Sequence, residues 1–216
     1  MAEIPQISPL EKDLLTELFN LGIGRAASSL SRMVHQEILL SVPDVRFAKS
    51  CALAELLKES GAIISIAQTI HGPFDAKAIL LFEQRGGLEV VKQILGAELD
   101  DNMLVALQEE ALSETGNVVL NACVGTLSTS MGYSFELDIP VFNHCSADQL
   151  LALNQLTANE SVLLININMA LKTSEVDAFL AFVVDETSFE KLKAKLSNLI
   201  SNLKTDEDTP KVSSCP

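Results

Sequence analysis

The chain has 216 residues with a formal net charge of -14, and hydrophobic residues make up 48% of it. This length is enough to bury a substantial core, while the acidic balance argues against a nucleic-acid partner because the summed field repels phosphodiester backbones. No apolar run approaches the roughly 18 residues of a membrane span, and the first residues, MAEIPQISPLEKD, carry no secretion signal. We therefore expect a cytoplasmic protein with neither nucleic acid nor a membrane as its partner.

The first half of the chain is predicted to begin with a long helix. Ser8, Pro9 and Glu11 are typical of a helix N-terminus, and the helix is expected to continue to about Val34. The strand that follows contains Pro43, which suits an edge or bulged position because proline cannot donate to a sheet. In order, the elements after the helix are a strand at 36–48, a short helix at 51–59, a hairpin of strands at 62–71 and 75–83, and a helix at 87–95.

The second half of the chain repeats this order of elements. They are predicted as a helix at 101–131, a strand at 133–144, a short helix at 146–153, strands at 160–170 and 175–184, and a final helix at 186–203. We expect a single domain over residues 1–205, made of two repeats at about 8–97 and 101–203. Residues 206–216 are charged and uncapped, and we expect them to form a disordered tail.

The predicted strands indicate a sheet that is covered on both faces. The runs AIISIA and SVLLIN are apolar at successive residues, which is typical of strands buried on both sides. Helices on each side would cover them, or the sheet could close on its twin. We predict an α+β fold in which two pseudo-twofold-related α-β-α-β-β-α halves share a mainly antiparallel sheet of about six strands, covered by helices.

An internal duplication is the most informative feature of the sequence. Residues 13–43 align with residues 110–140 without a gap, at an offset of 97 residues. The aligned pairs include Asp13 with Glu110, Glu17 with Glu114, Asn20 with Asn117, Ser31 with Ser128, and Pro43 with Pro140. Duplication of this kind usually means two copies of one structural unit that pack about a pseudo-twofold axis. Two equivalent sites are therefore expected.

A polar stripe runs along the helix in the second copy. Leu112, Val119 and Leu120 fall outside this stripe at helical spacing. Its members are Glu110, Glu114, Asn117, Asn121, Gly125 and Ser128. A carboxylate and a primary amide, Glu114 and Asn117, are therefore neighbours on one face.

The recurrence of the acid and the amide favours a functional role. A single Glu-x-x-Asn on a helix is usually part of a solvated face, but asparagine is a poor helix former and here occupies the same place in both copies. Nearby positions differ, since Gly24 aligns with Asn121. A carboxylate can receive a cation from a partner, and an amide can both accept from and donate to one water molecule. We predict the catalytic residues to be Glu17, Asn20, Glu114 and Asn117, with Asp13, Glu110, Pro43 and Pro140 in support.

Other hydrolytic mechanisms lack their residues in this sequence. There is no nucleophile paired with a base, no HExxH and no phosphate-binding loop, and the GxG of LGIGR lies inside a predicted helix. His35, His71 and His144 are far apart in the sequence, and we interpret each as a packed or edge residue. A hydrolase built in this way must take its metal and its electrophile from the partner, so we expect it to have no cofactor of its own.

The cysteines do not indicate a disulfide framework or a metal site. Cys51, Cys123, Cys145 and Cys215 are widely spaced, with no CxxC pair. The first three are predicted to be buried thiols, and Cys215 lies in the polar tail.

These residues resemble a known family. The first copy of the motif reads Asp13-x-x-x-Glu17-x-x-Asn20, followed by Pro43, and the second reads Glu114-x-x-Asn117 with Pro140. This pattern resembles the signature of the CheC/CheX/FliY phosphatases of bacterial chemotaxis, and NLGIGRAASSLSRM is similar to the first helix of that family. The resemblance covers about residues 8–203. Two motif copies without an appended domain resemble the CheC branch, whereas Glu110 departs from the Asp or Ser of the family pattern.

The resemblance implies a reaction and a partner. Members of the family hydrolyse the aspartyl phosphate of the response regulator CheY, which holds its own Mg²⁺. Glu17 and Glu114 would then pair with a lysine of the regulator, while Asn20 and Asn117 would insert and orient the attacking water. Acyl phosphates are already activated, so a positioned water and stabilised charge are nearly all that the reaction requires.

The resemblance also implies a second partner and an alternative function. CheC-like members bind the receptor deamidase CheD, and the predicted short helix SADQLLALNQ around Asp148 is a candidate surface for it. The alternative function is a non-catalytic adaptor, like the middle domain of flagellar switch proteins, which shares the fold and only binds a regulator or CheD. Retention of the acid and the amide in both copies argues against an adaptor.

Overall fold

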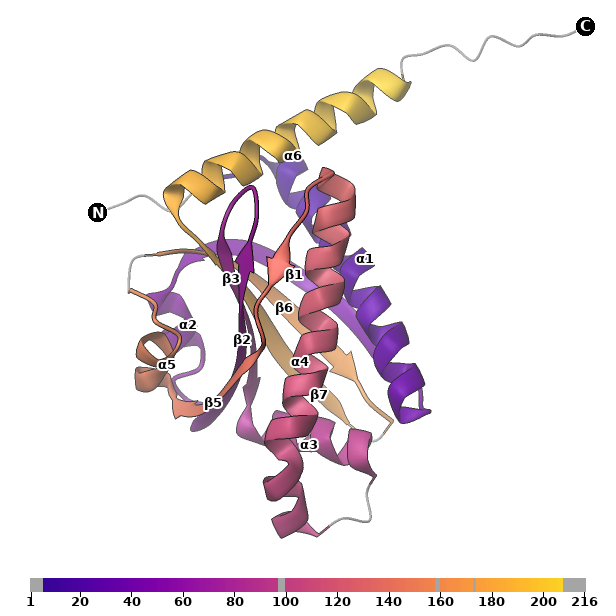
Figure 1. Ribbon diagram of the computed structural model, residues 1–216, viewed down its shortest axis with the longest axis vertical. Coiled ribbons are helices and arrows are strands. Elements are labelled where there is room, and N and C mark those ends of the chain that lie inside the picture. The colour runs from indigo at the N-terminus through magenta and orange to yellow at the C-terminus, as the bar shows by residue number, and fades with distance from the viewer. Residues whose placement is uncertain (1–5, 97–99, 158–159, 173, 208–216) are drawn as a thin grey trace, which may run out of the picture.

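The computed structural model describes residues 6–96, 100–157, 160–172 and 174–207. Over these residues it contains six helices and seven strands (Figure 1). Their bounds are α1 (Pro9–Val34), β1 (Leu39–Lys49), α2 (Cys51–Leu56), β2 (Ala62–His71), β3 (Ala76–Glu83), α3 (Gln84–Leu95), α4 (Asp101–Met131), β4 (Glu136–Leu137), β5 (Val141–Ser146), α5 (Ala147–Leu153), β6 (Ser161–Ala170), β7 (Glu175–Val184) and α6 (Glu186–Glu207).

The strands form one open sheet in the order β1-β6-β7-β3-β2-β4, with β5 also beside β2. Each of these strand pairs is antiparallel. The hairpins β2–β3 and β6–β7 meet at the centre through β3 and β7, and the first strand of each half lies outside the hairpin of the other half. This symmetric order confirms the predicted α+β architecture, and because the sheet is open, the alternative of a sheet closed on its twin is wrong.

The sheet has seven strands, whereas about six were expected. The prediction of one continuous strand at 133–144 is wrong, because this segment forms two separate strands, β4 and β5. The chain pairs with β2 at β4, leaves the sheet over residues 138–140, and pairs again at β5. Pro140 ends this gap, and it cannot donate to a ladder. In β1 the aligned Pro43 causes only a shift of register between Ser41 and Asp44. The predicted edge and bulged position of Pro43 is therefore confirmed.

Helices cover both faces of the sheet, as the apolar strand runs predicted. The larger core lies between the sheet and α1, α3, α4 and α6, and a smaller core lies under α2 and α5 (Figure 1). Side chains of a strand alternate between faces. In β2, Ile64 and Ile66 therefore belong to the larger core, while Ile63 and Ala67 belong to the smaller one.

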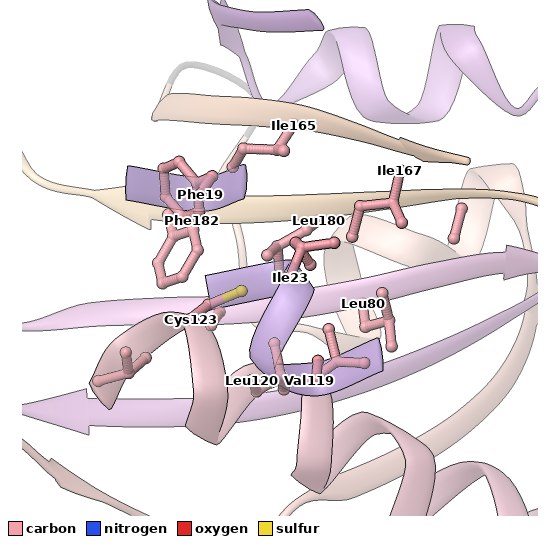
Figure 2. Close-up of a cluster of buried hydrophobic side chains, with 14 of the residues drawn as sticks. Phe19, Ile23, Leu80, Val119, Leu120, Cys123, Ile165, Ile167, Leu180 and Phe182 are labelled. Carbon is pink, nitrogen blue, oxygen red and sulfur yellow. The ribbon is translucent and has the colours of Figure 1, made fainter. Parts of the chain in front are cut away.

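The centre of the larger core is built by α1, α4 and the middle strands. Figure 2 shows Phe19 of α1 beside Phe182 of β7, with their ring centroids 5.4 Å apart. Val119, Leu120 and Cys123 of α4 line the same core and are almost fully buried. Burial of each large apolar side chain contributes roughly 1.5–3 kcal/mol. The buried faces of α1 and α4 thus fix which of their residues remain at the surface.

Helices α1 and α4 pack closely on each other. A Cβ atom at Gly22 of α1 would lie 3.0 Å from the Cα atom of Cys123, so a larger residue there would push the helices apart. At the same crossing, the Arg25 guanidinium donates to the Thr126 hydroxyl at 3.1 Å. The two copies of the duplicated helix are therefore held side by side at the sheet surface.

The ends of α1 and α4 show the duplication in atomic detail. Helix α1 begins with the predicted capping box, in which Ser8 and Glu11 bond each other's backbone N–H groups. It ends at His35, whose φ of 54° is left-handed, and the aligned Gly132 ends α4 with a φ of 63°. Only glycine adopts this conformation without a steric penalty. His35 thus takes a conformation that its own side chain disfavours.

The aligned serines Ser31 and Ser128 attach each helix to the chain that follows. The Ser31 hydroxyl accepts from the Ile38 N–H at 2.9 Å and donates to the Ile38 carbonyl at 3.2 Å. The Ser128 hydroxyl donates to the Tyr133 carbonyl at 2.6 Å. Their recurrence in both copies is therefore explained by structure.

Most of the predicted element bounds agree with the structure within a few residues. Helix α4 has the predicted bounds, whereas α3 begins three residues before the predicted position 87 and α6 continues to Glu207. Residues 206 and 207 of the predicted tail therefore belong to α6, and the rest of that tail lies outside the described residues. Within the described part of the chain, no helix is both long enough and apolar enough to span a membrane.

The prediction of three buried thiols is wrong for Cys51. This residue is exposed at the start of α2, whereas Cys123 and Cys145 are buried. The short helix buries only Leu53, so its first turn is free to face solvent. Cys215 lies outside the described residues.

Candidate functional site

The four predicted site residues lie at the surface, in two pairs. Glu17 and Asn20 of α1 are exposed; Glu114 of α4 is exposed and Asn117 is half-buried. We call the first pair, with Asp13 and Pro43, site one. The second pair, with Glu110 and Pro140, is site two. Another protein can therefore reach both.

Site one is shaped by the bulge in β1. The side-chain oxygen of Asn20 accepts a hydrogen bond from the backbone N–H of Val42 at 3.2 Å. Val42 stands in the bulge beside Pro43, where the pairing of β1 with β6 is interrupted. This interruption leaves the Val42 N–H available for the helix. Pro43 thus supports the site through the path of the backbone, and it does not need to contact a partner.

Site two holds the same amide oxygen in a different way. The Oδ1 atom of Asn117 accepts from Nε2 of Gln68 at 3.2 Å and from Nδ2 of Asn121 at 2.7 Å. Nε2 of Gln68 also donates to the backbone carbonyl of Asp138 at 3.0 Å. Sequence analysis missed Gln68, although one polar side chain within the apolar run AIISIAQTIH is a sign of a specific buried partner.

The carboxylates of both sites are available to a partner. Glu17, Glu114, Asp13 and Glu110 are exposed, and within the described part of the chain none of them forms a hydrogen bond or an ion pair. The ion pair closest to site one joins Lys12 to Asp44 at 3.1 Å and does not involve these residues. A cation from another protein therefore would not have to displace an internal one.

The described residues contain no group of three or more His, Cys, Asp or Glu side chains that could hold a metal ion. His35 caps a helix, and His144 is exposed on β5. His71 is exposed between Asp75 and Asp138, at nitrogen–oxygen distances of 3.6 and 3.4 Å. The polar side chains of the predicted motif at both sites are carboxylates and amides.

Sequence comparison connects the chain to chemotaxis proteins. No protein-family model matches the sequence. The CheY-P phosphatase CheC of Bacillus subtilis strain 168 is 22% identical over 194 residues, which cover 84% of this chain and 91% of CheC. The flagellar motor switch phosphatase FliY of the same organism is 21% identical over 140 residues, which are 64% of this chain and only 36% of FliY.

Solved structures share the fold. The crystal structure of Thermotoga maritima FliY has a TM-score of 0.73 at 18% identity, over 90% of this chain and 100% of that one. CheX in the CheX–CheY–BeF₃–Mg²⁺ complex from Borrelia burgdorferi has a TM-score of 0.50 at 19% identity, over 79% and 97% of the chains. The chain is thus similar in sequence to CheC and FliY, and it shares its fold with FliY and CheX. The FliG–FliM complex from H. pylori has a TM-score of 0.63 at 10% identity, over 87% and 100% of the chains, so this fold also occurs in that complex.

In this chain, the two copies of the motif have similar positions, but different groups hold their asparagines. Each asparagine turns its side-chain oxygen towards the sheet, where a hydrogen-bond donor holds it. The donor is a backbone N–H in site one and the side chain of Gln68 in site two. As a result, the amide nitrogen of each asparagine is directed away from that donor.

Proposed function

We propose that this protein accelerates hydrolysis of the aspartyl phosphate on a CheY-type response regulator. The observation that carries the proposal is the exposed pair of a free carboxylate and a held amide, present at the same place on both helices. The printed names of its relatives, a CheY-P phosphatase and a flagellar motor switch phosphatase, support this choice of substrate.

The carboxylates Glu17 and Glu114 dock the regulator. Each is exposed and unpaired within the described chain, so each can receive a lysine of the partner. An exposed ion pair contributes only about 0.2–1 kcal/mol. The pair therefore sets the register between the two proteins, and most of the affinity has to come from the surrounding surface.

The amides Asn20 and Asn117 position the attacking water. In site one, Val42 donates to Oδ1, so the NH₂ group of Asn20 can donate to a water oxygen while the second lone pair of Oδ1 accepts a hydrogen bond from the same water. A water held by two such bonds loses most of its orientational freedom before the reaction, which lowers the barrier. An amide that is already held loses little freedom of its own.

The reaction needs no covalent intermediate on this protein. The oxygen of the positioned water forms a bond to phosphorus, the bond between phosphorus and the aspartyl oxygen breaks, and inorganic phosphate leaves. The regulator's aspartate regains its carboxylate, and the second proton of the water is released to solvent. The Mg²⁺ that the regulator brings would neutralise charge on the phosphoryl oxygens.

A non-catalytic adaptor is the second candidate function. It is favoured by the likeness of the fold to the FliM middle domain and to a chain of the FliG–FliM complex from H. pylori. An adaptor gives no reason for two amides fixed by hydrogen bonds beside two unpaired carboxylates.

Helix α5 lies on the opposite face of the sheet and carries the exposed Asp148. We propose this helix as the surface for CheD under either function.

The test follows the decay of a phosphorylated CheY-type regulator with and without this protein. Wild type should accelerate the decay, Asn20→Ala and Asn117→Ala should each retain part of the acceleration, and the double variant should decay at the spontaneous rate. Asn102→Ala is a matched control, because Asn102 is an exposed asparagine on the first turn of α4. A wild-type protein that binds the regulator without accelerating its decay would establish the adaptor.

A further inference from the structure

Gln68 is a polar exception on a buried surface. It lies on β2 between Ile66 and Ile70, on the face that packs against α4, and is only 3% exposed. Burying an amide is unfavourable unless its polar atoms are hydrogen-bonded. Its Nε2 atom makes two bonds, to Asn117 and to Asp138, so the side chain connects α4 with the gap between β4 and β5.

These two bonds determine the orientation of the Asn117 amide. The Asp138 backbone carbonyl can only accept, so the NH₂ group of Gln68 must face it at 3.0 Å. The same NH₂ group then requires an acceptor from Asn117, which is Oδ1 at 3.2 Å. The opposite orientation of Gln68 would bring its oxygen against the Asp138 oxygen. The chain of bonds therefore starts at an immovable backbone acceptor and ends with the NH₂ group of Asn117 directed away from Gln68.

Gln68 forms its hydrogen bonds through its nitrogen, Nε2, while its side-chain oxygen, Oε1, remains unsatisfied. Within the described residues, the buried Oε1 atom of Gln68 has no hydrogen-bond partner. An unsatisfied buried carbonyl is destabilising. A residue selected only for packing would be apolar at this place, as its neighbours Ile66 and Ile70 are.

Site one has no glutamine at the position equivalent to Gln68, and a different group donates to its asparagine. The residue at the same position in the second hairpin is Ile167, since Gln68 faces Ala78 and Ile167 faces Ala178 in the strand pairings. Ile167 lies opposite the bulge in β1, where the N–H of Val42 holds the amide. Both sites thus contain one inward donor to the asparagine.

The backbone is displaced in site two, so it cannot supply that donor. Val42 is 6% exposed, whereas the aligned Ile139 is 85% exposed in the gap between β4 and β5. Helix α4 also lies very close to β2, because a Cβ atom at Gly116 would be 2.5 Å from Cγ2 of Ile66. This close approach brings Asn117 within reach of a side chain on β2.

We infer that Gln68 is a positioning residue of site two: it holds the carbonyl of Asn117 towards the sheet and thereby presents the NH₂ group to the phosphorylated regulator. This inference rests on the proposed function. Gln68 is buried and does not contact the regulator, so it acts on the rate at saturation and not on docking.

The experiment uses Gln68→Met, which keeps the length of the side chain, removes both N–H donors and adds no charge. In the Asn20→Ala background, where only site two works, the maximal rate of regulator dephosphorylation should fall about tenfold, because a misoriented catalytic contact is costly. The regulator concentration at half-maximal rate should stay the same. In the Asn117→Ala background site two is already inactive, so Gln68→Met should leave the maximal rate unchanged. The fold-decrease in the first background divided by that in the second therefore measures the effect on site two alone. Gln36→Met, at an exposed glutamine, is the matched control.

A second measurement is independent of activity. The side-chain amide NMR signals of Asn117 should shift in Gln68→Met, while those of Asn20 should not. Unmoved Asn117 signals, an unchanged maximal rate in the Asn20→Ala background, or an equal loss in both backgrounds would each overturn the inference. Failure of the proposed function is a different result, because then wild type itself would not accelerate the decay, while the NMR shift would still show whether Gln68 holds Asn117.

Discussion

The oxygens of Asn20 and Asn117 differ in how many hydrogen bonds they accept. An amide oxygen has two lone pairs. Asn20 receives one bond, from Val42, whereas Asn117 receives two, from Gln68 and Asn121. Under the proposed mechanism, Asn20 can therefore accept a hydrogen bond from the attacking water at once, whereas Asn117 must first lose the bond from Asn121. The NH₂ groups of both asparagines can donate in either case.

Removing the Asn121 amide should make site two faster. Asn121 is exposed, so its bond to Asn117 is worth only about 0.5–1 kcal/mol net, and its loss corresponds to a rise of about two- to fivefold in rate. We expect this rise for Asn121→Ala in the Asn20→Ala background, measured as the decay of the phosphorylated regulator. The aligned residue in site one, Gly24, has no side chain that could compete. A lower rate in Asn121→Ala would show that Asn121 supports Asn117 and does not compete with the water.

Sequence alone predicted four candidate site residues because they recur, while the donors that hold the two asparagines depend on the fold. The role of Val42 comes from a bulge, and that of Gln68 comes from the packing of α4 on β2. Neither contact joins residues that are close in sequence. A lone glutamine in an apolar strand indicated a buried partner, but only the strand pairing identifies Asn117 as that partner.

At the scale of elements, the two proline-containing strands show why bounds were harder to predict than types. Helices α1 and α4 were predicted almost to the residue because their apolar period and caps are local. The strand around Pro140 breaks into β4 and β5, while the strand around Pro43 stays whole. The difference lies in what faces each proline, a buried glutamine or a buried isoleucine, and that depends on the neighbouring strand.

Glu11 joins α1 to α6 through a buried carboxylate. One of its oxygens accepts from the Ser8 N–H at 2.8 Å, and the other accepts from the Ser197 hydroxyl of α6 at 2.8 Å. Burial raises the pKa of Glu11, but the bonds from Ser8 and Ser197, together with the charge of Lys193, outweigh it and lower the pKa below its usual 4.5. The folded state therefore favours the ionised form.

Replacing Glu11 should remove a part of the stability that depends on pH. Because the folded pKa is lowered, the ionised group stabilises the fold fully above its unfolded pKa of about 4.5, and this contribution is lost as the pH falls through the folded value. Glu11→Gln should cost roughly 1–3 kcal/mol at pH 7, from weakened charge-assisted bonds. The difference from wild type should shrink below pH 4.5 in urea unfolding. Glu37→Gln, at an exposed glutamate, is the control; a difference that stays constant with pH would contradict the role of the charge.

At the scale of the whole molecule, one sheet separates two hydrophobic cores of different size. The larger core supports α1 and α4, which present both sites, and the smaller one supports α2 and α5 on the opposite face (Figure 1). Under the proposed function, a regulator bound to the first face leaves the opposite face free for a second protein. Three cysteines lie in different parts of this arrangement. Cys123 is in the larger core, Cys145 is in the smaller core, and Cys51 is exposed on α2.

Alkylation of the native protein should therefore distinguish the three thiols. Burial raises the pKa of Cys123 to about 12 and also raises the pKa of Cys145, so burial disfavours the reactive thiolate of both. With iodoacetamide and peptide mass spectrometry, Cys51 should react at the rate of a free thiol, and the two buried thiols at least about a hundredfold more slowly, because they must wait for the core to open. In urea all three should react alike. Rapid alkylation of Cys123 alone would contradict the close packing of α1 on α4, and rapid alkylation of Cys145 alone would contradict the layer formed by α5.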